Sequence, residues 1–413
     1  MPSQAGRKTT ILFFYPNEFL GPEMTVYRQI IRHLDRTRFT PYLVLNSDAE
    51  GEVGLTEADG VVIRRWKFGG AFRGGIGSAL RSGLQLPAGF VGLVRFARRT
   101  GIDIVQCSPA PRTGTLGLLL AHACHARLLL HYHVIPGRYG GLRGWLEATL
   151  ARQGDHAVAV SRFLATHVSR MGVPPAKIDV VVNGVDCERF QPATDGTALR
   201  REFGIAPAAP LVVQLARIIQ QKRQEDVVQA FALARQQVPD LRGLLVGWED
   251  PRYDGPFAGY KAELRQRCRE LELGDSLIIA DARPDAPQIL AAADIVVMPS
   301  VGDAWNLAVT EAMAAGRPVI GAASGGIPEQ IVDGATGFLV APENPVALAA
   351  RLVTLAQDPA LRARMGRAAR LRAEHYFDEN RLAAGFAPIY DRLATQQPPL
   401  VAAPAPIRSR RER

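Results

Sequence analysis

Short apolar runs alternate with amphipathic helical segments along most of this chain, and this pattern limits its fold more than any other feature. In the first half we expect strands at residues 9–15, 42–45, 61–63, 102–106, 127–132, 157–160 and 179–182, and helices at 23–34, 90–99, 116–125 and 144–152. In the second half we expect strands at 211–215, 243–246, 276–279, 295–298, 318–321 and 337–340, and helices at 225–238, 260–271, 304–315, 345–355 and 361–374. Such alternation is typical of a parallel, doubly wound sheet covered by helices. The sequence therefore predicts an α/β fold.

The length of 413 residues indicates more than one domain, because a single hydrophobic core rarely serves a chain of this size. Turn-forming residues cluster between the two halves, at Asn183-Gly184, Pro192, Pro207 and Pro210. We predict a first Rossmann-like domain at 1–190, a linker at 191–210, a second Rossmann-like domain at 211–375, a helix at 376–395 that returns to the first domain, and a disordered basic tail at 396–413.

A weak internal repeat connects the halves. Asp103-Ile-Val opens an expected strand 25 residues before Leu128 in the next strand, and Asp294-Ile-Val stands 25 residues before Val319. Two similar sheets would explain this match, and chance explains a match of this length equally well.

Composition indicates the cellular compartment of the protein and the charge of its partner. The four cysteines show no Cys-x-x-Cys spacing, which disfavours a metal site or a disulfide framework and favours a reducing compartment. No run of 18 apolar residues predicts a membrane span, and residues 1–10 lack the apolar core of a signal peptide. We expect a cytoplasmic protein, with peripheral contact to the inner membrane face left open. The net charge of +9 favours an anionic partner without choosing its kind.

The stretch from Met298 to Ile320 combines a strand end, a polar loop and a helix start, and we expect a ligand at its loop. Asp303 and Glu311 stand eight positions apart, where both acids can face one ligand. The expected helix runs from about Ala304 to Ala315, and its first N–H groups would suit a phosphate.

Two fixed cations follow the strand 211–215. Arg217 and Lys222 lie in a loop at the carboxyl end of that strand, the edge where open α/β sheets bind ligands. Both side chains suit a diphosphate, Arg217 by its planar fork and Lys222 as a point charge. A solvated basic loop is the simpler interpretation of this pair alone, and the nearby acids favour a phosphate site.

Three weaker signals lie at other strand ends. His133 follows the strand 127–132 and can exchange hydrogen bonds near neutral pH, but His131 shares its face and a structural role is common. Gly325-Gly326 follows the strand 318–321 and lets a backbone approach a ligand. Gly21 is a comparable candidate in the first half.

In combination these residues resemble the retaining glycosyltransferases of family 4, which have the GT-B architecture of two Rossmann-like domains facing a cleft. The resemblance covers roughly residues 9 to 395. It rests on Ala159-Val-Ser161, Val182-Asn-Gly-Val-Asp186 with Phe190 and Pro192, Arg217 with Lys222, Pro299-Ser300, Glu311-Ala-Met-Ala-Ala-Gly316 with Pro318-Val319, Gly325-Gly326 with Glu329, and Asp333-Gly-x-x-Gly337-Phe-Leu-Val.

The resemblance implies a nucleotide-diphosphate sugar donor on the second domain and an acceptor on the first. Arg217 and Lys222 would hold the donor diphosphate, and Glu311 the ribose hydroxyls. The implied contacts to the sugar and phosphates are Asp303, the backbone amides of Ala304, Trp305, Asn306 and Leu307, the cleft residue His133, and the loop at Gly21.

Three positions depart from the family pattern: Asp303 stands for Glu, Ala304-Trp305-Asn306 for Gly-Phe-Gly, and Gly21-Pro22 for Gly-Gly. The implied reaction is front-face transfer with retention, in which the leaving diphosphate helps to deprotonate the acceptor. His133, Arg217, Lys222 and Asp303 would be the catalytic residues. The resemblance requires neither a metal nor a cofactor, and no Asp-x-Asp triplet or P-loop occurs in the chain.

Alternatives on the same fold are a sugar-nucleotide epimerase, a phosphorylase, and a non-catalytic nucleotide-sugar binding protein. We expect a small-molecule, glycan or lipid-linked acceptor, and its identity, the donor and the oligomeric state are left open. A basic and aromatic segment, Arg64 to Phe68 with Phe72, Arg73 and Arg81, is a candidate for membrane contact beside the simpler interpretation of an exposed loop. Nucleic-acid binding by residues 408–413 is disfavoured, because no aromatic residue interleaves the basic ones.

Overall fold

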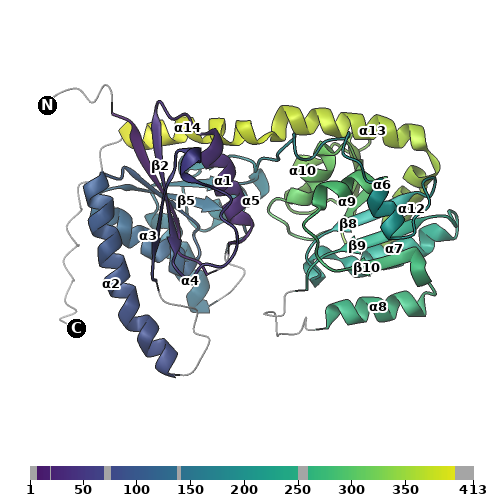
Figure 1. Cartoon of the computed structure of the whole chain (residues 1–413), viewed down its shortest axis with the longest axis horizontal. Helices are drawn as coiled ribbons and strands as arrows, with labels where there is room; N and C mark the ends of the chain where they lie inside the picture. The colour runs from purple at the N-terminus through teal and green to yellow at the C-terminus, as the bar shows by residue number, and fades with distance from the viewer. Residues whose placement is uncertain (1–6, 19, 69–75, 137–140, 250–258, 396–413) are drawn as a thin grey trace, which may run out of the picture. The chain divides into compact units, whose positions relative to one another are not determined.

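The computed structural model describes residues 7–18, 20–68, 76–136, 141–249 and 259–395 (Figure 1). Its strands form two sheets, one of seven strands and one of six. The strands of the first sheet are β1 (Thr9–Tyr15), β2 (Phe39–Asn46), β3 (Val62–Trp66), β4 (Ile104–Cys107), β5 (Arg127–Tyr132), β6 (His156–Ala159) and β7 (Ile178–Val180). Those of the second are β8 (Leu211–Leu215), β9 (Arg242–Val246), β10 (Leu277–Ala280), β11 (Ile295–Met298), β12 (Val319–Ala322) and β13 (Gly337–Val340).

Both sheets have the same strand order. The first runs β3-β2-β1-β4-β5-β6-β7 and the second runs β10-β9-β8-β11-β12-β13. In each sheet the chain moves outward from the first strand, then returns to the other side of that strand and moves outward again. The order therefore reverses between β1 and β4, and between β8 and β11, which pair in parallel. The predicted α/β fold of two Rossmann-like, doubly wound parallel sheets is confirmed.

The internal repeat in the sequence corresponds to equivalent positions in the two sheets. Asp103 precedes β4, and its carboxylate accepts from the backbone N of Thr10 at 2.8 Å. Asp294 precedes β11, and its carboxylate accepts from the backbone N of Leu211 at 2.9 Å. In both cases the aspartate backbone N returns a hydrogen bond to the same residue of the first strand. Of the two explanations for the repeat, the structure supports two similar sheets.

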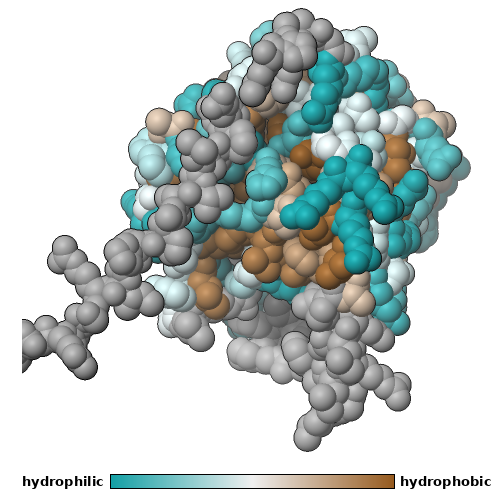
Figure 2. Space-filling view, turned by 90° about the vertical axis from the view of Figure 1, so that its left-hand side faces the viewer, coloured by the Kyte–Doolittle hydropathy of each residue, from teal (hydrophilic) through white to brown (hydrophobic). Residues whose placement is uncertain are grey.

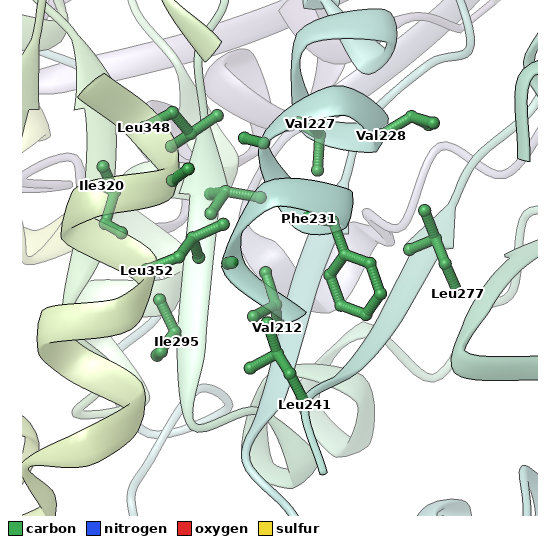
Figure 3. Close-up of a cluster of buried hydrophobic side chains, with 14 of the residues drawn as sticks. Val212, Val227, Val228, Phe231, Leu241, Leu277, Ile295, Ile320, Leu348 and Leu352 are labelled. Carbon is green, nitrogen blue, oxygen red and sulfur yellow. The ribbon is translucent and has the colours of Figure 1, made fainter. Parts of the chain in front are cut away.

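The hydrophobic core of the second sheet lies between its apolar strands and the helices that cover them. Helices α7 and α12 pack side by side on the sheet, and Phe231 and Leu352 meet strand residues such as Val212 between them (Figure 3). All three side chains are almost fully buried. Parallel strands buried on both faces need near-continuous apolar runs, and these runs made the strands visible in the sequence.

The helices follow the predicted alternation, with several differences at their ends. The α-helices are α1 (Pro22–His33), α2 (Ile76–Thr100), α3 (Pro111–Cys124), α4 (Gly141–Gln153), α5 (Arg162–Arg170), α6 (Thr197–Glu202), α7 (Gln224–Arg235), α8 (Tyr260–Glu270), α9 (Ala286–Ala292), α10 (Leu307–Ala314), α11 (Ile327–Gln330), α12 (Pro345–Gln357), α13 (Pro359–Arg372) and α14 (Glu379–Thr395). A π-helical turn, Ala373–Phe377, joins α13 to α14. The sequence missed the short helices α5, α9 and α11, and predicted α2 too short at its N-terminal end.

Contacts divide the chain into two compact units. Unit 1 comprises residues 1–131, 149–157 and 385–413, and unit 2 comprises residues 132–148 and 158–384. The domain boundaries inferred from the sequence stay a prediction. The expected basic tail, 396–413, lies outside the described residues.

All four cysteines are free thiols. Within the described residues, no helix combines the length and the apolar character that a membrane crossing needs.

Candidate functional site

Two loops of unit 2 leave the second sheet at the point where its strand order reverses. The loop after β8 carries Arg217 and Lys222, and the loop after β11 carries Asp303. Because β8 and β11 are neighbours but their following helices lead to opposite sides of the sheet, the two loops diverge from a common edge. Open α/β sheets bind their ligands at this kind of edge.

The carboxylate of Asp303 connects the two loops. Lys222 Nζ lies 2.6 Å from Asp303 Oδ2, and the two side chains are only 13% and 10% exposed. Gln221 Nε2 donates to Asp303 Oδ1 at 3.2 Å, and Asn306 Nδ2 donates to Oδ2 at 2.8 Å. Three donors thus hold one buried carboxylate, which fixes the ammonium group of Lys222 at the sheet edge.

Gly325 and Gly326 hold the same loop by close backbone approach. A Cβ on Gly325 would lie 2.2 Å from the carbonyl oxygen of Asp303, and one on Gly326 would lie 2.1 Å from that of Ala304. Gly325 also has a φ of +65°, which favours glycine. Gly326 N donates to the Asp303 carbonyl at 2.7 Å. The lack of side chains at Gly325 and Gly326 therefore allows close packing against the backbone of Asp303 and Ala304. The sequence had predicted that it allows contact with a ligand, which stays a prediction.

Helix α10 begins at Leu307, three residues after the expected start at Ala304. Asn306 precedes the helix in an extended conformation, and Gln330 binds its backbone on both sides, accepting from its N at 3.3 Å and donating to its carbonyl at 2.8 Å. Ala304 is buried, and the buried ring of Trp305 packs edge-on against Phe377 at 5.3 Å. The side chains of this loop thus anchor it to the protein.

Glu311 lies on α10, one turn after its first residue, and is half-buried. Burial raises the pKa of its carboxyl group to about 7, and the charge of Arg189 opposes this shift only in part. Near neutral pH the group is therefore divided between its acid and its carboxylate. A carboxyl group of this kind can bind uncharged hydroxyls.

His133 and His131, which the sequence did not separate, have different surroundings. His131 is fully buried in β5, with Gln106 Nε2 at 3.3 Å from its Nδ1 and the rings of Tyr27 and Phe386 beside it. His133 lies just beyond the strand and is half-buried. Burial lowers the pKa of His133 to about 3, so its ring is neutral at physiological pH and can exchange hydrogen bonds.

Within unit 2 the structure brings the segment that follows His133 close to the loop after β11. A Cβ built on Gly302 would lie 3.6 Å from Ile135 Cδ1, two residues beyond His133.

Arg217 is exposed and makes no ion pair with any residue the structure describes. Gly21 belongs to unit 1, where it precedes α1 and donates its N–H to Tyr15 Oη at 3.0 Å. The assignment of these residues to donor or acceptor stays a prediction.

Sequence reasoning missed two glutamines that position the loops. Gln221 and Gln330 contact Asp303 and Asn306, as described above, and nothing in the sequence marks them except their position beside motifs. The carboxylate of Glu329 accepts from the backbone N of Arg162 and Phe163 at 2.9 and 2.8 Å, and so caps α5. The two sequence motifs that contain Ser161 and Glu329 therefore meet at the N-terminus of α5, which both side chains cap.

The membrane-contact segment expected from the sequence is only partly exposed. The ring of Trp66 packs against Phe96 at 5.2 Å, and Phe68 is buried against Phe14 at 5.5 Å. Phe72 and Arg73, and the side chain of Arg81, lie outside the described residues. The aromatic side chains that can be described therefore belong to the core of unit 1, and the exposed part of the segment is basic.

Two sequence families match the chain. The profile described as Glycosyltransferase Family 4 matches residues 24–189, and the profile described as Glycosyl transferases group 1 matches residues 195–372. The chain belongs to glycosyltransferase family 4 and has the GT-B fold.

Relatives with assigned activities match part of the chain. A D-inositol 3-phosphate glycosyltransferase of Streptomyces avermitilis is 37% identical over 205 residues, which cover 48% of this chain and 43% of the relative. An N-acetyl-alpha-D-glucosaminyl L-malate synthase of Bacillus anthracis is 31% identical over 238 residues, which cover 58% and 60%. The matched part of the chain thus spans about half the length of these relatives.

Solved structures share the fold over nearly the whole chain. Anabaena HepE, in a complex with UDP and glucose, has a TM-score of 0.77 at 22% identity and covers 94% of this chain and 100% of its own. A sucrose-phosphate synthase from Thermosynechococcus elongatus has a TM-score of 0.78 at 20% identity and covers 94% and 99%.

Proposed function

We propose that this protein is a retaining glycosyltransferase that moves a sugar from a nucleotide-diphosphate sugar to an acceptor, without a metal or cofactor. The observation that carries the proposal is the buried Lys222–Asp303 pair, held by Gln221 and Asn306 where the order of the second sheet reverses. An ammonium group fixed at such an edge is suited to a phosphate. Membership of glycosyltransferase family 4 supports this interpretation.

Each predicted site residue has a role in this reaction. The anomeric C–O bond breaks with its electron pair moving to the diphosphate, and Lys222, the exposed Arg217 and the first N–H groups of α10 stabilise the new charge. Glu311 binds the ribose hydroxyls, and Asp303 binds a sugar hydroxyl while it holds Lys222. His133, as a neutral ring, donates to the sugar.

The acceptor oxygen forms its new bond on the face that the diphosphate leaves. The proton of the acceptor hydroxyl passes to the departing diphosphate, so that the configuration at the anomeric carbon is retained. No protein carboxylate is needed as a nucleophile in this mechanism, in contrast to the retaining glycosidases.

The test is turnover of nucleotide sugars with analysis of the product. UDP-glucose is the first donor to use, because it is the ligand in one HepE complex of the same fold. We expect transfer to an acceptor, a product with the anomeric configuration of the donor by NMR, and unchanged rates with EDTA. Inversion of configuration, or loss of activity that added metal restores, would contradict the proposal.

Product analysis also separates the alternatives. An epimerase changes the donor without an acceptor, and a phosphorylase consumes inorganic phosphate. A non-catalytic binding protein would bind the nucleotide sugar in calorimetry and show no turnover with a broad acceptor panel.

We also propose peripheral contact with an anionic membrane through the basic segment that begins at Arg64. Figure 2, a view from the side of the molecule where Figure 1 places α2, shows hydrophobic and hydrophilic residues interspersed on the surface. Within that segment the side chains of Arg64, Arg65 and Lys67 are exposed. Flotation with anionic vesicles tests the contact, and binding that persists unchanged at high salt would contradict its electrostatic basis.

A further inference from the structure

The first sheet has its own reversal point, and a polar cluster lies there. Strands β1 and β4 are neighbours, and the helices that follow them, α1 and α3, lead to opposite sides. The end of β1 and the segments just after β1 and β4 supply five polar side chains. These are Tyr15, Asn17, Glu23, Ser108 and Thr113, which we call the Glu23 cluster.

The members of the Glu23 cluster are joined by hydrogen bonds across the two strand ends. Ser108 Oγ donates to Glu23 Oε1 at 3.4 Å, and Thr113 Oγ1 donates to Asn17 Oδ1 at 3.2 Å. Tyr15 Oη accepts from Gly21 N at 3.0 Å. Ser108 and Thr113 are buried, whereas Asn17 and Glu23 are half-buried. The cluster thus has a fixed base and two side chains that reach solvent.

The charge of the cluster differs from that of the Lys222 site. The groups that face Glu23 are Ser108 and Cys107 at the end of β4, Tyr15 at the end of β1 and Tyr27 on α1. Burial raises the pKa of Glu23 to about 7, and only the Ser108 hydroxyl opposes this shift. No basic side chain of the described residues lowers the pKa of Glu23.

These surroundings disfavour an anionic ligand. A phosphate or carboxylate would place its charge beside the Glu23 carboxyl group, and among the described residues no basic side chain facing that group offsets the charge. Both neighbouring helices begin with proline, Pro22 and Pro111, so each lacks one of the N–H groups that bind anions. Carboxyl, amide and hydroxyl side chains together can both accept from and donate to alcohol groups.

We propose that the Glu23 cluster binds the acceptor as an uncharged, polyhydroxylated molecule, with Glu23 accepting a hydrogen bond from an acceptor hydroxyl. This assignment rests on the proposed transferase function and names its acceptor class. It differs from the acceptors in the names of the two relatives, an inositol phosphate and malate, which are both anionic. Glu23 is then a residue that selects against phosphorylated acceptors.

The experiment measures ligand binding by NMR titration of the full chain, so that it does not depend on turnover. The probes are two matched pairs: myo-inositol with inositol 3-phosphate, and glucose with glucose 6-phosphate. Glu23→Gln removes the charge at nearly constant shape, and Glu52→Gln removes an exposed charge of unit 1 as a control. UDP is titrated separately into each variant.

We expect at least one uncharged probe to bind, about tenfold more tightly at pH 8 than its phosphorylated counterpart. We expect Glu23→Gln to weaken that binding about tenfold and to remove its increase between pH 6 and pH 8, and Glu52→Gln to change nothing. Tighter binding of the phosphorylated probes, no binding of any uncharged probe, or unchanged binding by Glu23→Gln would overturn the assignment. Failure of the wild-type chain to bind UDP would instead count against the proposed function.

Discussion

The two reversal points of this molecule share a topology and differ in charge. At the second sheet, a lysine and an aspartate form a buried pair between the loops after β8 and β11. At the first sheet, the equivalent position between β1 and β4 holds a carboxyl group, a hydroxyl and a phenol, and no ion pair with Glu23 occurs among the described residues. We therefore propose different ligands for the same strand order, a diphosphate at the second sheet and a polyol at the first.

The difference lies in the loops and not in the strands. Strand order and the Asp103 and Asp294 contacts repeat almost residue for residue, because they close the same kind of sheet. The loops after the strands do not repeat. Because loops positioned by a rigid sheet are where ligands usually bind, a few loop residues are enough to give the two edges different charges.

The largest effect is expected from Lys222→Ala, which removes the cation that makes the second edge suited to a diphosphate. We expect kcat/KM to fall by about 10²- to 10³-fold, the usual range for loss of one group that stabilises developing charge. Lys177→Ala, which removes an exposed lysine, serves as a control for net charge and should leave kcat/KM unchanged. Equal kcat/KM in both variants would contradict the proposal that the charge of Lys222 suits the second sheet's edge to a diphosphate.

The next effect tests whether the close approach of Gly325 holds the loop after β11 in place. Gly325→Ala adds a methyl group at a φ of +65° and 2.2 Å from a backbone oxygen, so we expect a lower melting temperature and weaker UDP binding. Gly334→Ala is a matched control, because its φ of +73° carries the same left-handed cost of about 1–2 kcal/mol without a nearby atom. Similar losses of UDP affinity in both variants would show that the close contact does not matter.

A smaller effect is expected from Glu311→Gln, which tests binding of the ribose hydroxyls. With a pKa of about 7, Glu311 is mainly ionised at pH 8 and mainly protonated at pH 6. We expect UDP affinity to fall about tenfold at pH 8 and by much less at pH 6, because only the carboxylate offers charged acceptors. Calorimetry at both pH values decides this, with the exposed Glu263→Gln as control. A loss that does not depend on pH would argue for a purely structural role.

The smallest effect is on the pH dependence of the free energy of unfolding, and it is expected to be similar for Glu23 and Glu311. Both pKa values are raised from 4.5 to about 7, so the folded state holds these protons more tightly than the unfolded state. Stability contributed by each group is therefore complete below pH 4.5 and lost as the pH rises through 7. We expect the stability of Glu23→Gln and of Glu311→Gln, relative to the wild-type chain, to increase from pH 5 to pH 7 and then level off. Urea denaturation at several pH values measures this difference, and a gain that is equal at all pH values would be inconsistent with burial as the cause.

Much of the fold could be predicted from the sequence, because buried parallel strands produce apolar runs. The bounds of β1, β5, β8 and β13 agree with the predicted ranges. The short helices α5, α9 and α11 were missed, since their few apolar positions give little periodicity and their ends depend on contacts distant in sequence. The cap of α5 by Glu329 is such a contact.

The candidate site was predictable in its residue types but not in their partners. Arg217, Lys222, Asp303 and Glu311 were all visible as charged residues at strand ends or helix starts. That Asn306 would bind Asp303 was not visible, because a side chain three residues away can point in several directions. The shorter Asp303 and the larger Asn306, which both depart from the family pattern, prove to be partners.

By itself the sequence determined the α/β class, the repeated order of elements and the charged residues after each strand, because these follow from local apolar periodicity and turn-forming residues. The tertiary structure decided which histidine is in the core, which carboxyl groups have a cation beside them, and which glycines contact another backbone. These properties depend on neighbours that are tens to hundreds of residues away in the chain. Burial and pairing set the charge of each strand edge, and only the folded chain fixes them.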